Sequence, residues 1–236
     1  MKKILFYTFI TIIGMANTVQ AKNINCRTSQ PDWMPDLNRV YKVNEFHIYY
    51  SDLAGSKHKL PQTADSNRNK IPDYVENIAI QASNSRDMFK LAGFRSPLHS
   101  PRYVNNTEAI AIFLLNINGN GTAFESPAIH TNLSPNLKTM PCSLNIHISH
   151  NLEGFPGSWA TVTHELFHLY QYGYAQFKNS WYLESLANWA DRAVKIDITA
   201  NTQKLPILPQ NSTELENQIF KQSYTPLWRR LFLINQ

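Results

Sequence analysis

Two histidines placed one helical turn apart constrain this chain more than any other feature. His164 and His168 belong to an H-E-x-x-H motif, with Glu165 between them, in a segment, 158–174, whose apolar residues recur at helical spacing. Each residue of an α-helix advances by about 100°, so both imidazoles would project from one side of the helix. The apolar residues on the opposite arc are Trp159, Val162, Leu166 and Leu169. The segment is therefore expected to bury its back in a core while its front offers two ligands to one metal ion.

A third ligand is expected from the next helical segment, 181–194, where Glu184 is the best candidate. A helix, a short turn and an antiparallel second helix would bring Glu184 beside the two histidines. Zinc uses such a set of His, His and Glu with an open fourth position. The alternative is an exposed glutamate on an amphipathic helix. Because the residues around Glu184 are mostly apolar, that helix is expected to be largely buried, where an unpaired carboxylate is costly, and this favours the ligand interpretation.

The two segments together resemble a known family. The motif followed by Trp181-x-x-Glu184-x-x-Ala187-x-Trp189 is similar to secreted bacterial metallopeptidases of the gluzincin type. The tract Ile71-Pro72-Asp73-Tyr74-Val75-Glu76, after an Asp- and Asn-rich run, extends the likeness to about residues 45–195. The resemblance implies that His164, His168 and Glu184 are zinc ligands and that Glu165 is the catalytic base. One departure is Ser185, where such proteins usually have Gly after the ligand glutamate.

The chemistry expected of such a site is hydrolysis. Zinc lowers the pKa of a bound water to about 7 and polarises the scissile carbonyl. Glu165 would take the proton of that water and pass it to the leaving amine. The oxyanion needs a further donor, and the sequence does not choose among Tyr170, Tyr172, Tyr174, His147, His150 and Tyr224. The alternative is that these tyrosines serve packing and that the two histidines lie on the surface.

Two further side chains are candidate partners of the histidine ligands. Asn188 and Asp191 follow Glu184 by one and two helical turns, and either could hold the second ring nitrogen of a zinc-bound histidine. A carboxylate makes the ligand more basic, which favours Asp191. The alternative is that both side chains face solvent.

Residues 144–149 are the expected binding strand for a peptide substrate. Apolar and polar side chains alternate there, which predicts a strand with one buried and one wet face. At a sheet edge beside the zinc helix, such a strand would bind an extended peptide as an additional strand. The alternative is that its polar residues simply face water.

Residues 65–76 have the spacing of an EF-hand-type calcium loop, with oxygen donors at loop positions 1, 3, 5, 9 and 12 and a backbone carbonyl at position 7. The residues are Asp65, Asn67, Asn69, Ile71, Asp73 and Glu76. Position 6, normally Gly, is Lys70, which would need a positive φ. We expect weak calcium binding, at about 10⁻⁴–10⁻³ M, or a loop of Asx turns that leads into a helix.

The pattern of the whole chain predicts an α+β fold. With 43% hydrophobic and 17% charged residues over 236 positions, the chain is too apolar for disorder and long enough for one core. Strands are expected at 46–50, 109–117 and 144–149, and helices at 72–91, 158–174, 181–194 and 212–234. This gives one domain, 22–236, with a sheet-containing part at about 40–155 and a helical part at about 156–236.

The N-terminus indicates export. Residues 1–21 combine Lys2 and Lys3, an apolar run and a polar end at Ala21, as a signal peptide does. The run is shorter than the roughly 20 residues that a spanning helix needs, and no other segment is long enough. In an oxidising compartment Cys26 and Cys142 are expected to form a disulfide, the alternative being two free thiols.

The pattern of charged residues argues against nucleic acid as a partner. The formal net charge of +5 falls when the two N-terminal lysines leave with the signal peptide. No run of Lys or Arg interleaves with aromatic residues, so nucleic acid is not an expected partner.

The leading hypothesis is a secreted or periplasmic zinc peptidase of zincin-like architecture that acts on proteins or peptides. The second hypothesis is a secreted, metal-stabilised binding or adhesion module without turnover, against which the intact Glu165 argues. A third is a zinc hydrolase of a non-peptide bond, because the motif specifies the metal chemistry and not the substrate.

Overall fold

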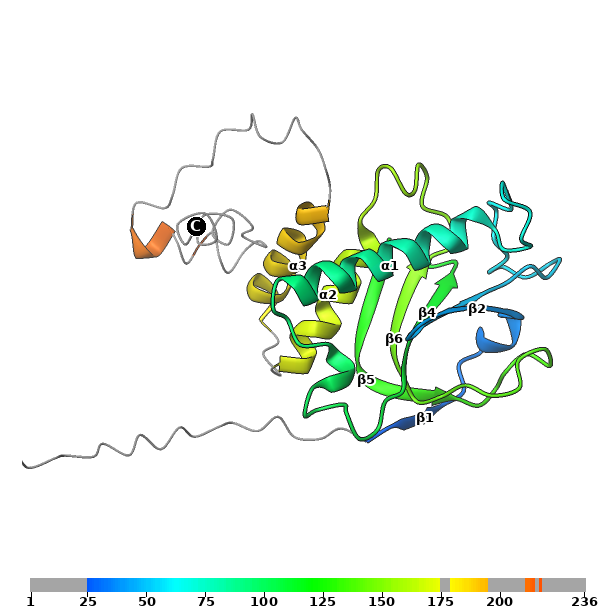
Figure 1. Ribbon diagram of the computed structural model, residues 1–236, viewed down its shortest axis with the longest axis horizontal. Coiled ribbons are helices and arrows are strands. Elements are labelled where there is room, and N and C mark those ends of the chain that lie inside the picture. Colours follow the sequence, from blue (N-terminus) through cyan, green and yellow to red (C-terminus); the bar gives the residue numbers. More distant parts are fainter. Residues whose placement is uncertain (1–24, 175–178, 195–210, 215–216, 218–236) are drawn as a thin grey trace, which may run out of the picture.

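The computed structural model describes residues 25–174, 179–194, 211–214 and 217, and it has the α+β fold expected from the sequence. A six-stranded mixed sheet is followed in the chain by helices (Figure 1). In chain order the elements are β1 (Arg27–Ser29), η1 (Met34–Asp36), β2 (Arg39–Val43), β3 (Phe46–Tyr50), α1 (Asp73–Leu91), η2 (Pro97–His99), β4 (Ala109–Leu115), β5 (Gly121–His130), β6 (Ser143–Ser149), α2 (Thr161–Tyr174) and α3 (Ser180–Val194).

The six strands lie in the order β1-β5-β6-β4-β3-β2. β3, β4 and β6 are parallel, and α1 makes the crossover from β3 to β4. β2 and β5 run antiparallel to β3 and β6. β1 pairs with β5 at its last residues only, from Ala128 to His130. Within the described residues, the first half of β5 therefore has a strand on one side and none on the other.

The predicted elements are present at nearly the predicted bounds. The predicted strands correspond to β3, β4 and β6, and three of the predicted helices to α1, α2 and α3. Pro72 directly precedes α1, and Gly93 follows its end with a φ of +84°, which glycine adopts without strain. Of the fourth predicted helix, 212–234, the structure describes 212–214 and 217, which are helical.

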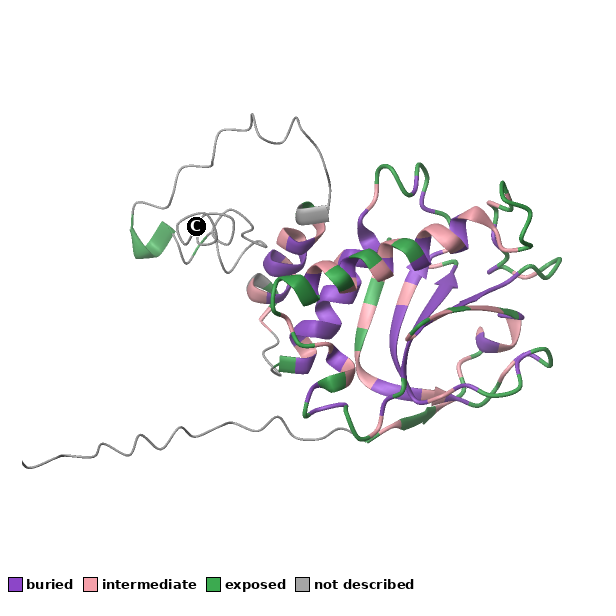
Figure 2. Cartoon of the chain, in the orientation of Figure 1, coloured by how far each residue is buried: buried purple, intermediate pink, exposed green. Residues whose placement is uncertain are grey.

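The larger core lies between the sheet and the helices. α1 and α2 pack on one sheet face, and α2 contacts β5, β6 and α3. Of the predicted back of α2, Val162, Leu166 and Leu169 are fully buried, whereas Trp159 precedes the helix and is only partly buried. Each such side chain contributes about 1.5–3 kcal/mol. Figure 2 shows this burial along α2 and the central strands, whereas the outer side of α1 is exposed. Burial of its back therefore sets the direction in which α2 presents its front.

β6 lies inside the sheet, so the prediction that 144–149 form an open edge is wrong. β6 pairs with β4 on one side and with β5 on the other. Its polar side chains do not form a wet face, because a second, smaller core covers that face of the sheet. Trp33, just before η1, contacts the rings of Phe113 and His147 there. His147, expected on the surface, is half-buried in this layer.

A disulfide joins the two cysteines, as predicted. The Cα atoms of Cys26 and Cys142 are 6.1 Å apart, and the bond ties the segment before β1 to the residue before β6. Such bonds are typical of oxidising compartments. Within the described residues, none of the helices combines the length and the hydropathy that a bilayer crossing requires. The predicted signal peptide, 1–21, lies outside the described residues.

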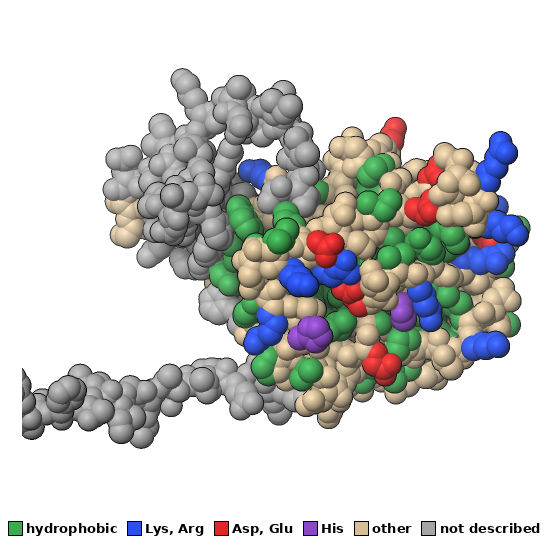
Figure 3. Space-filling view, viewed as in Figure 1, with side chains coloured by type: hydrophobic (Ala, Val, Ile, Leu, Met, Phe, Trp, Pro, Cys, Tyr) green, Lys and Arg blue, Asp and Glu red, His purple; other side chains and the backbone are tan. Residues whose placement is uncertain are grey.

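Acidic and basic side chains are neighbours on the face that carries α1 (Figure 3). Arg86 of α1, for example, pairs with Glu45 at 2.8 Å and with Asp87 at 2.9 Å. Mixed charge of this kind favours solubility over the binding of a polyanion.

Candidate metal centre

α1 anchors the first turn of α2. The side chain of Gln81 accepts a hydrogen bond from the backbone N–H of Val162 at 3.1 Å and donates one to the carbonyl of Trp159 at 2.9 Å. This satisfies backbone groups that a helix start leaves free. The hydroxyls of Ser85 and Thr163 lie 2.7 Å apart in the core between the two helices. α2 also contacts α3 and β5.

His164 and His168 of α2 meet Glu184 of α3. The Nε2 atoms of the two histidines are 3.1 Å apart. The carboxylate oxygens of Glu184 lie 3.3 Å from Nε2 of His164 and 3.6 Å from Nε2 of His168. In the part of the chain that the structure describes, this is the one group of three His, Cys, Asp or Glu side chains whose ligand atoms lie within 4.8 Å of one another.

These distances suit a tetrahedral zinc site. Ligand atoms that each lie about 2.0–2.1 Å from a tetrahedral zinc are about 3.4 Å from one another. The two Nε2 atoms are 3.1 Å apart, and each lies close to that distance from one oxygen of the Glu184 carboxylate, 3.3 Å from Oε2 for His164 and 3.6 Å from Oε1 for His168. Two imidazole nitrogens with one carboxylate also match zinc in chemical type, whereas calcium takes oxygen ligands alone. The donor set therefore fits zinc.

The electrostatics of the group favour a cation. When their rings are protonated, His164 and His168 donate hydrogen bonds to Glu184, and these hold the pKa of Glu184 well below its usual range. Burial lowers the pKa of His168, but the hydrogen bond to Glu184 and the charges of Glu165 and Glu184 outweigh burial, so the pKa of His168 is raised. The side chain of Glu184 is 47% exposed, so solvent screens part of this field.

Glu165 lies beside the ligand group and is 7% exposed. Burial raises the pKa of its carboxyl, which also accepts a hydrogen bond from the backbone N–H of Ala123 in β5. A Cβ added to Gly121 would lie 2.7 Å from Cγ of Glu165, so α2 and β5 approach closely at this point because residue 121 has no side chain. Sequence reasoning did not single out Gly121.

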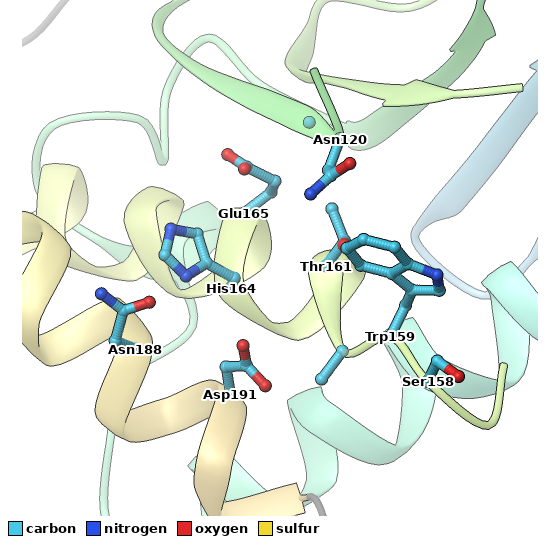
Figure 4. A pocket seen from close by; sticks show the side chains of 10 residues that line it. Asn120, Ser158, Trp159, Thr161, His164, Glu165, Asn188 and Asp191 are labelled. Carbon is cyan, nitrogen blue, oxygen red and sulfur yellow. The ribbon is translucent and has the colours of Figure 1, made fainter. Parts of the chain in front are cut away.

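A pocket opens next to Glu165 and His164. Figure 4 shows Asn120, which precedes β5, and Glu165 at one side of this space, with Trp159 and Ser158 at another. Asn188 and Asp191, the predicted partners of the ligand histidines, line it from α3 on the side of His164 (Figure 4). Their role as hydrogen-bond partners of a ligand stays a prediction.

Gln171 is a neighbour of the ligands that sequence reasoning missed. Its Oε1 lies 2.8 Å from Nδ1 of His168, and its Nε2 donates to the carbonyl of Leu183 at 3.0 Å. The available signal was its spacing, since a residue three positions after His168 on a helix lies on the same face.

Of the candidate oxyanion donors that the structure describes, Tyr172 is the one whose ring contacts a ligand histidine. Its ring stacks on that of His168, with centroids 6.1 Å apart and planes 16° from parallel. Burial and the carboxylates of Glu165, Glu184 and Glu125 raise the pKa of Tyr172.

Four of the other candidates have different surroundings. The buried ring of Tyr170 packs on Phe89, the hydroxyl of Tyr174 accepts from the backbone of Arg95, and a ring nitrogen of His150 lies 2.9 Å from the carbonyl of Lys59. His147 belongs to the layer around Phe113, and Tyr224 lies outside the described residues.

The calcium-like loop has the predicted backbone feature at position 6. Lys70 has a φ of +71°, where a calcium loop usually has Gly. Asp65 accepts hydrogen bonds from the backbone of Asn69 and Lys70, and the amide of Asn69 donates to Glu76. Asp73 accepts from Ser66 instead, at the first turn of α1. Calcium binding by the loop stays a prediction.

Ser185, the departure from the family pattern, is fully buried within α3. Glu184 reaches the histidines although a serine and not a glycine follows it.

Searches for similar proteins among family models, curated proteins and solved structures found no match to this chain.

Proposed function

We propose that this chain is a secreted zinc-dependent peptidase that hydrolyses peptide bonds in proteins or peptides. The observation that carries the proposal is the convergence of His164 and His168 with Glu184, at distances that suit one tetrahedral ion, next to the buried carboxyl of Glu165. Zinc in such a site supplies a Lewis acid that acidifies water and polarises a carbonyl.

Glu165 is the proposed general base. It borders the pocket, and the N–H of Ala123 fixes one side of its carboxylate. A carboxylate held in this way would accept a proton from the attacking water and deliver it to the leaving amine. Its position on the residue after His164 places it beside the ligands without making it one.

The first half of β5 is the proposed contact strand for the substrate. Gly121 to Phe124 pair with β6 on one side, and β1 begins to pair with β5 only at Ala128. An extended peptide could add to this free edge by backbone hydrogen bonds, beside Glu165. This assignment replaces 144–149, which lie inside the sheet. A ligand helix beside an open strand edge also supports the proposal of a zincin-like architecture.

Tyr172 is the proposed donor to the oxyanion. It is the described candidate whose ring lies against a ligand histidine, and the charges of Glu165 and Glu184 help to raise the pKa of its hydroxyl. A positioned phenolic O–H can stabilise negative charge that develops on the carbonyl oxygen.

Secretion is supported by two features. Residues 1–21 have the pattern of a signal peptide, and Cys26 and Cys142 form a disulfide in the part of the chain that would remain.

The test is hydrolysis of unfolded casein by purified mature protein. We expect cleavage that a zinc chelator abolishes and added zinc restores, and we expect Glu165→Gln to abolish cleavage while zinc stays bound. Glu153→Gln is the matched control, because Glu153 is an exposed loop residue. Bound zinc without cleavage of casein or of a peptide library would favour a binding module. Cleavage of ester or glycan substrates alone would favour a different hydrolase.

A further inference from the structure

Gln171 connects the two helices that carry the candidate ligands. It is a residue of α2 that is 7% exposed, and both ends of its amide are engaged. Oε1 lies 2.8 Å from Nδ1 of His168, and Nε2 donates to the carbonyl of Leu183 at 3.0 Å. Leu183 immediately precedes Glu184 in α3. One buried side chain thus contacts a ligand histidine and the residue next to the ligand carboxylate.

These two contacts determine where the ring proton of His168 lies. The carbonyl of Leu183 can only accept a hydrogen bond, so the group of Gln171 that faces it is the NH₂. The group that faces His168 is then the amide oxygen, which also only accepts. Nδ1 of His168 must therefore carry a proton, and in the neutral ring Nε2 keeps its lone pair. Nε2 is the atom that lies next to His164 and Glu184.

We propose that Gln171 is a positioning residue for the metal centre. It holds His168 in the tautomer whose Nε2 lone pair faces the metal, and by the same amide it holds the backbone beside Glu184 within reach of that ion. The proposal rests on the proposed function, because it assigns a partner to a zinc ligand. Histidine ligands of metals generally donate their second N–H to an acceptor, and loss of such a partner lowers metal affinity about 10–100-fold.

The neighbour of Nδ1 of His168 is Gln171, and the predicted roles of Asn188 and Asp191 stay predictions. Both line the pocket on the side of His164 (Figure 4), whereas Gln171 contacts His168 on the side of the imidazole that faces away from the ligand group. The partner of His168 therefore comes from its own helix.

The test uses Gln171→Leu, which removes both contacts and replaces the amide by an apolar side chain of similar size. The first readout is the zinc dissociation constant, measured by competition with a chelator of known affinity, and we expect it to rise about 10–100-fold. The second readout is the ring-nitrogen chemical shifts of His168 in metal-free protein labelled with ¹⁵N-histidine. At a pH above the titration of this ring, where it is neutral, we expect the Nδ1–H tautomer in the parent and a mixture of tautomers in the variant.

Gln81→Leu is the matched control. Gln81 also uses both ends of its amide, but its partners are Trp159 and Val162 at the start of α2. We expect this variant to be less stable and to keep the tautomer of His168 and the zinc affinity of the parent. Equal losses of affinity in both variants, or an unchanged tautomer in Gln171→Leu, would overturn the proposal.

A second variant decides the outcome if Gln171→Leu does not fold. Gln171→Glu keeps an acceptor beside Nδ1 of His168 and removes the donor to Leu183. We expect the Nδ1–H tautomer in this variant, and a mixture of tautomers there would contradict the assigned role. If the parent protein binds no zinc, the proposed function fails, and the nitrogen shifts of the metal-free proteins still decide whether Gln171 sets the tautomer.

Discussion

Gly121 of β5 lies directly against the side chain of Glu165 in α2. A Cβ built at residue 121 would be 2.7 Å from Cγ and 3.0 Å from Oε1 of Glu165, and 3.0 Å from the methyl group of Thr161. Contacts at 2.7 Å between carbon atoms are well inside van der Waals distance. The absence of a side chain at residue 121 therefore determines where the carboxylate of the proposed base can lie.

Gly121→Ala should displace Glu165 and leave the metal ligands in place. A misplacement of about 1 Å at a catalytic group can reduce a rate about 100-fold, and we expect kcat for casein peptides to fall by about that factor. The measurement is steady-state hydrolysis together with zinc content, and the zinc content should remain that of the parent.

Gly157→Ala is the control for this substitution. The nearest atom to an added Cβ at residue 157 is the carbonyl oxygen of Gly154 at 3.6 Å, an ordinary contact. Its activity should match that of the parent. A Gly121→Ala protein as active as Gly157→Ala would show that the close approach has no bearing on catalysis.

Tyr172→Phe should lower kcat with little change in KM. Removal of one donor to an oxyanion typically costs about 10²–10³ in kcat, because the hydrogen bond strengthens only as charge develops. Tyr170→Phe is the control, since Tyr170 lies on the same helix with its ring in the core against Phe89. The experiment is a comparison of kcat and KM for one peptide substrate, and equal activity of the two variants would exclude Tyr172 as the donor.

The stability of the fold should decrease in mild acid because of histidines in the second core. Burial, together with the nearby His130 and His58, lowers the pKa of His147 from 6.5 to about 4. The unfolded chain therefore binds a proton at this residue more readily than the folded chain. The corresponding free energy of unfolding, about 3 kcal/mol, is present above pH 6.5 and is lost as the pH falls to 4.

His147→Phe should weaken this pH dependence, because phenylalanine keeps the ring contacts with Trp33, Phe113 and Phe124 and does not titrate. Urea unfolding at several pH values between 7 and 4 measures the effect. The variant should lose less stability than the parent over this range, and some dependence should persist because burial also lowers the pKa values of His130 and His58. Parallel curves for parent and variant would contradict the assignment to His147.

The elements that sequence reasoning predicted well are those whose pattern is local. α1 and α2 have apolar residues at helical spacing, β4 is a continuous apolar run, and proline or glycine marks the ends of α1. β5 was not predicted because Pro127 interrupts its sequence, and the structure accommodates this proline at an irregularity between Phe124 and Ala128. β1 and β2 are short and lie at the sheet edges, where a residue pattern is weakest.

The strand order and part of the site depend on contacts between distant segments. The alternation of apolar and polar residues in β6 predicted a face exposed to water. Residues near Trp33 cover that face, and nothing in the sequence of β6 itself indicates that they do. The spacing of His164, His168 and Glu184 was sufficient to predict that they meet, because two helices joined by a short turn return on themselves. Gly121 acts through a contact with α2 that no local pattern indicates, whereas Gln171 had one signal, its spacing of three residues from His168, but its contact with α3 depends on the tertiary fold.

Zinc content tests whether His164, His168 and Glu184 together bind one metal ion. The parent protein, Glu165→Gln and Glu184→Ala are purified from zinc-supplemented medium, dialysed against buffer without chelator and analysed for metal by plasma emission spectrometry. We expect one zinc per chain in the parent and in Glu165→Gln. We expect almost none in Glu184→Ala, because Glu184 is the proposed ligand from α3. A parent protein without zinc, or a Glu184→Ala protein that retains one zinc per chain, would contradict this assignment.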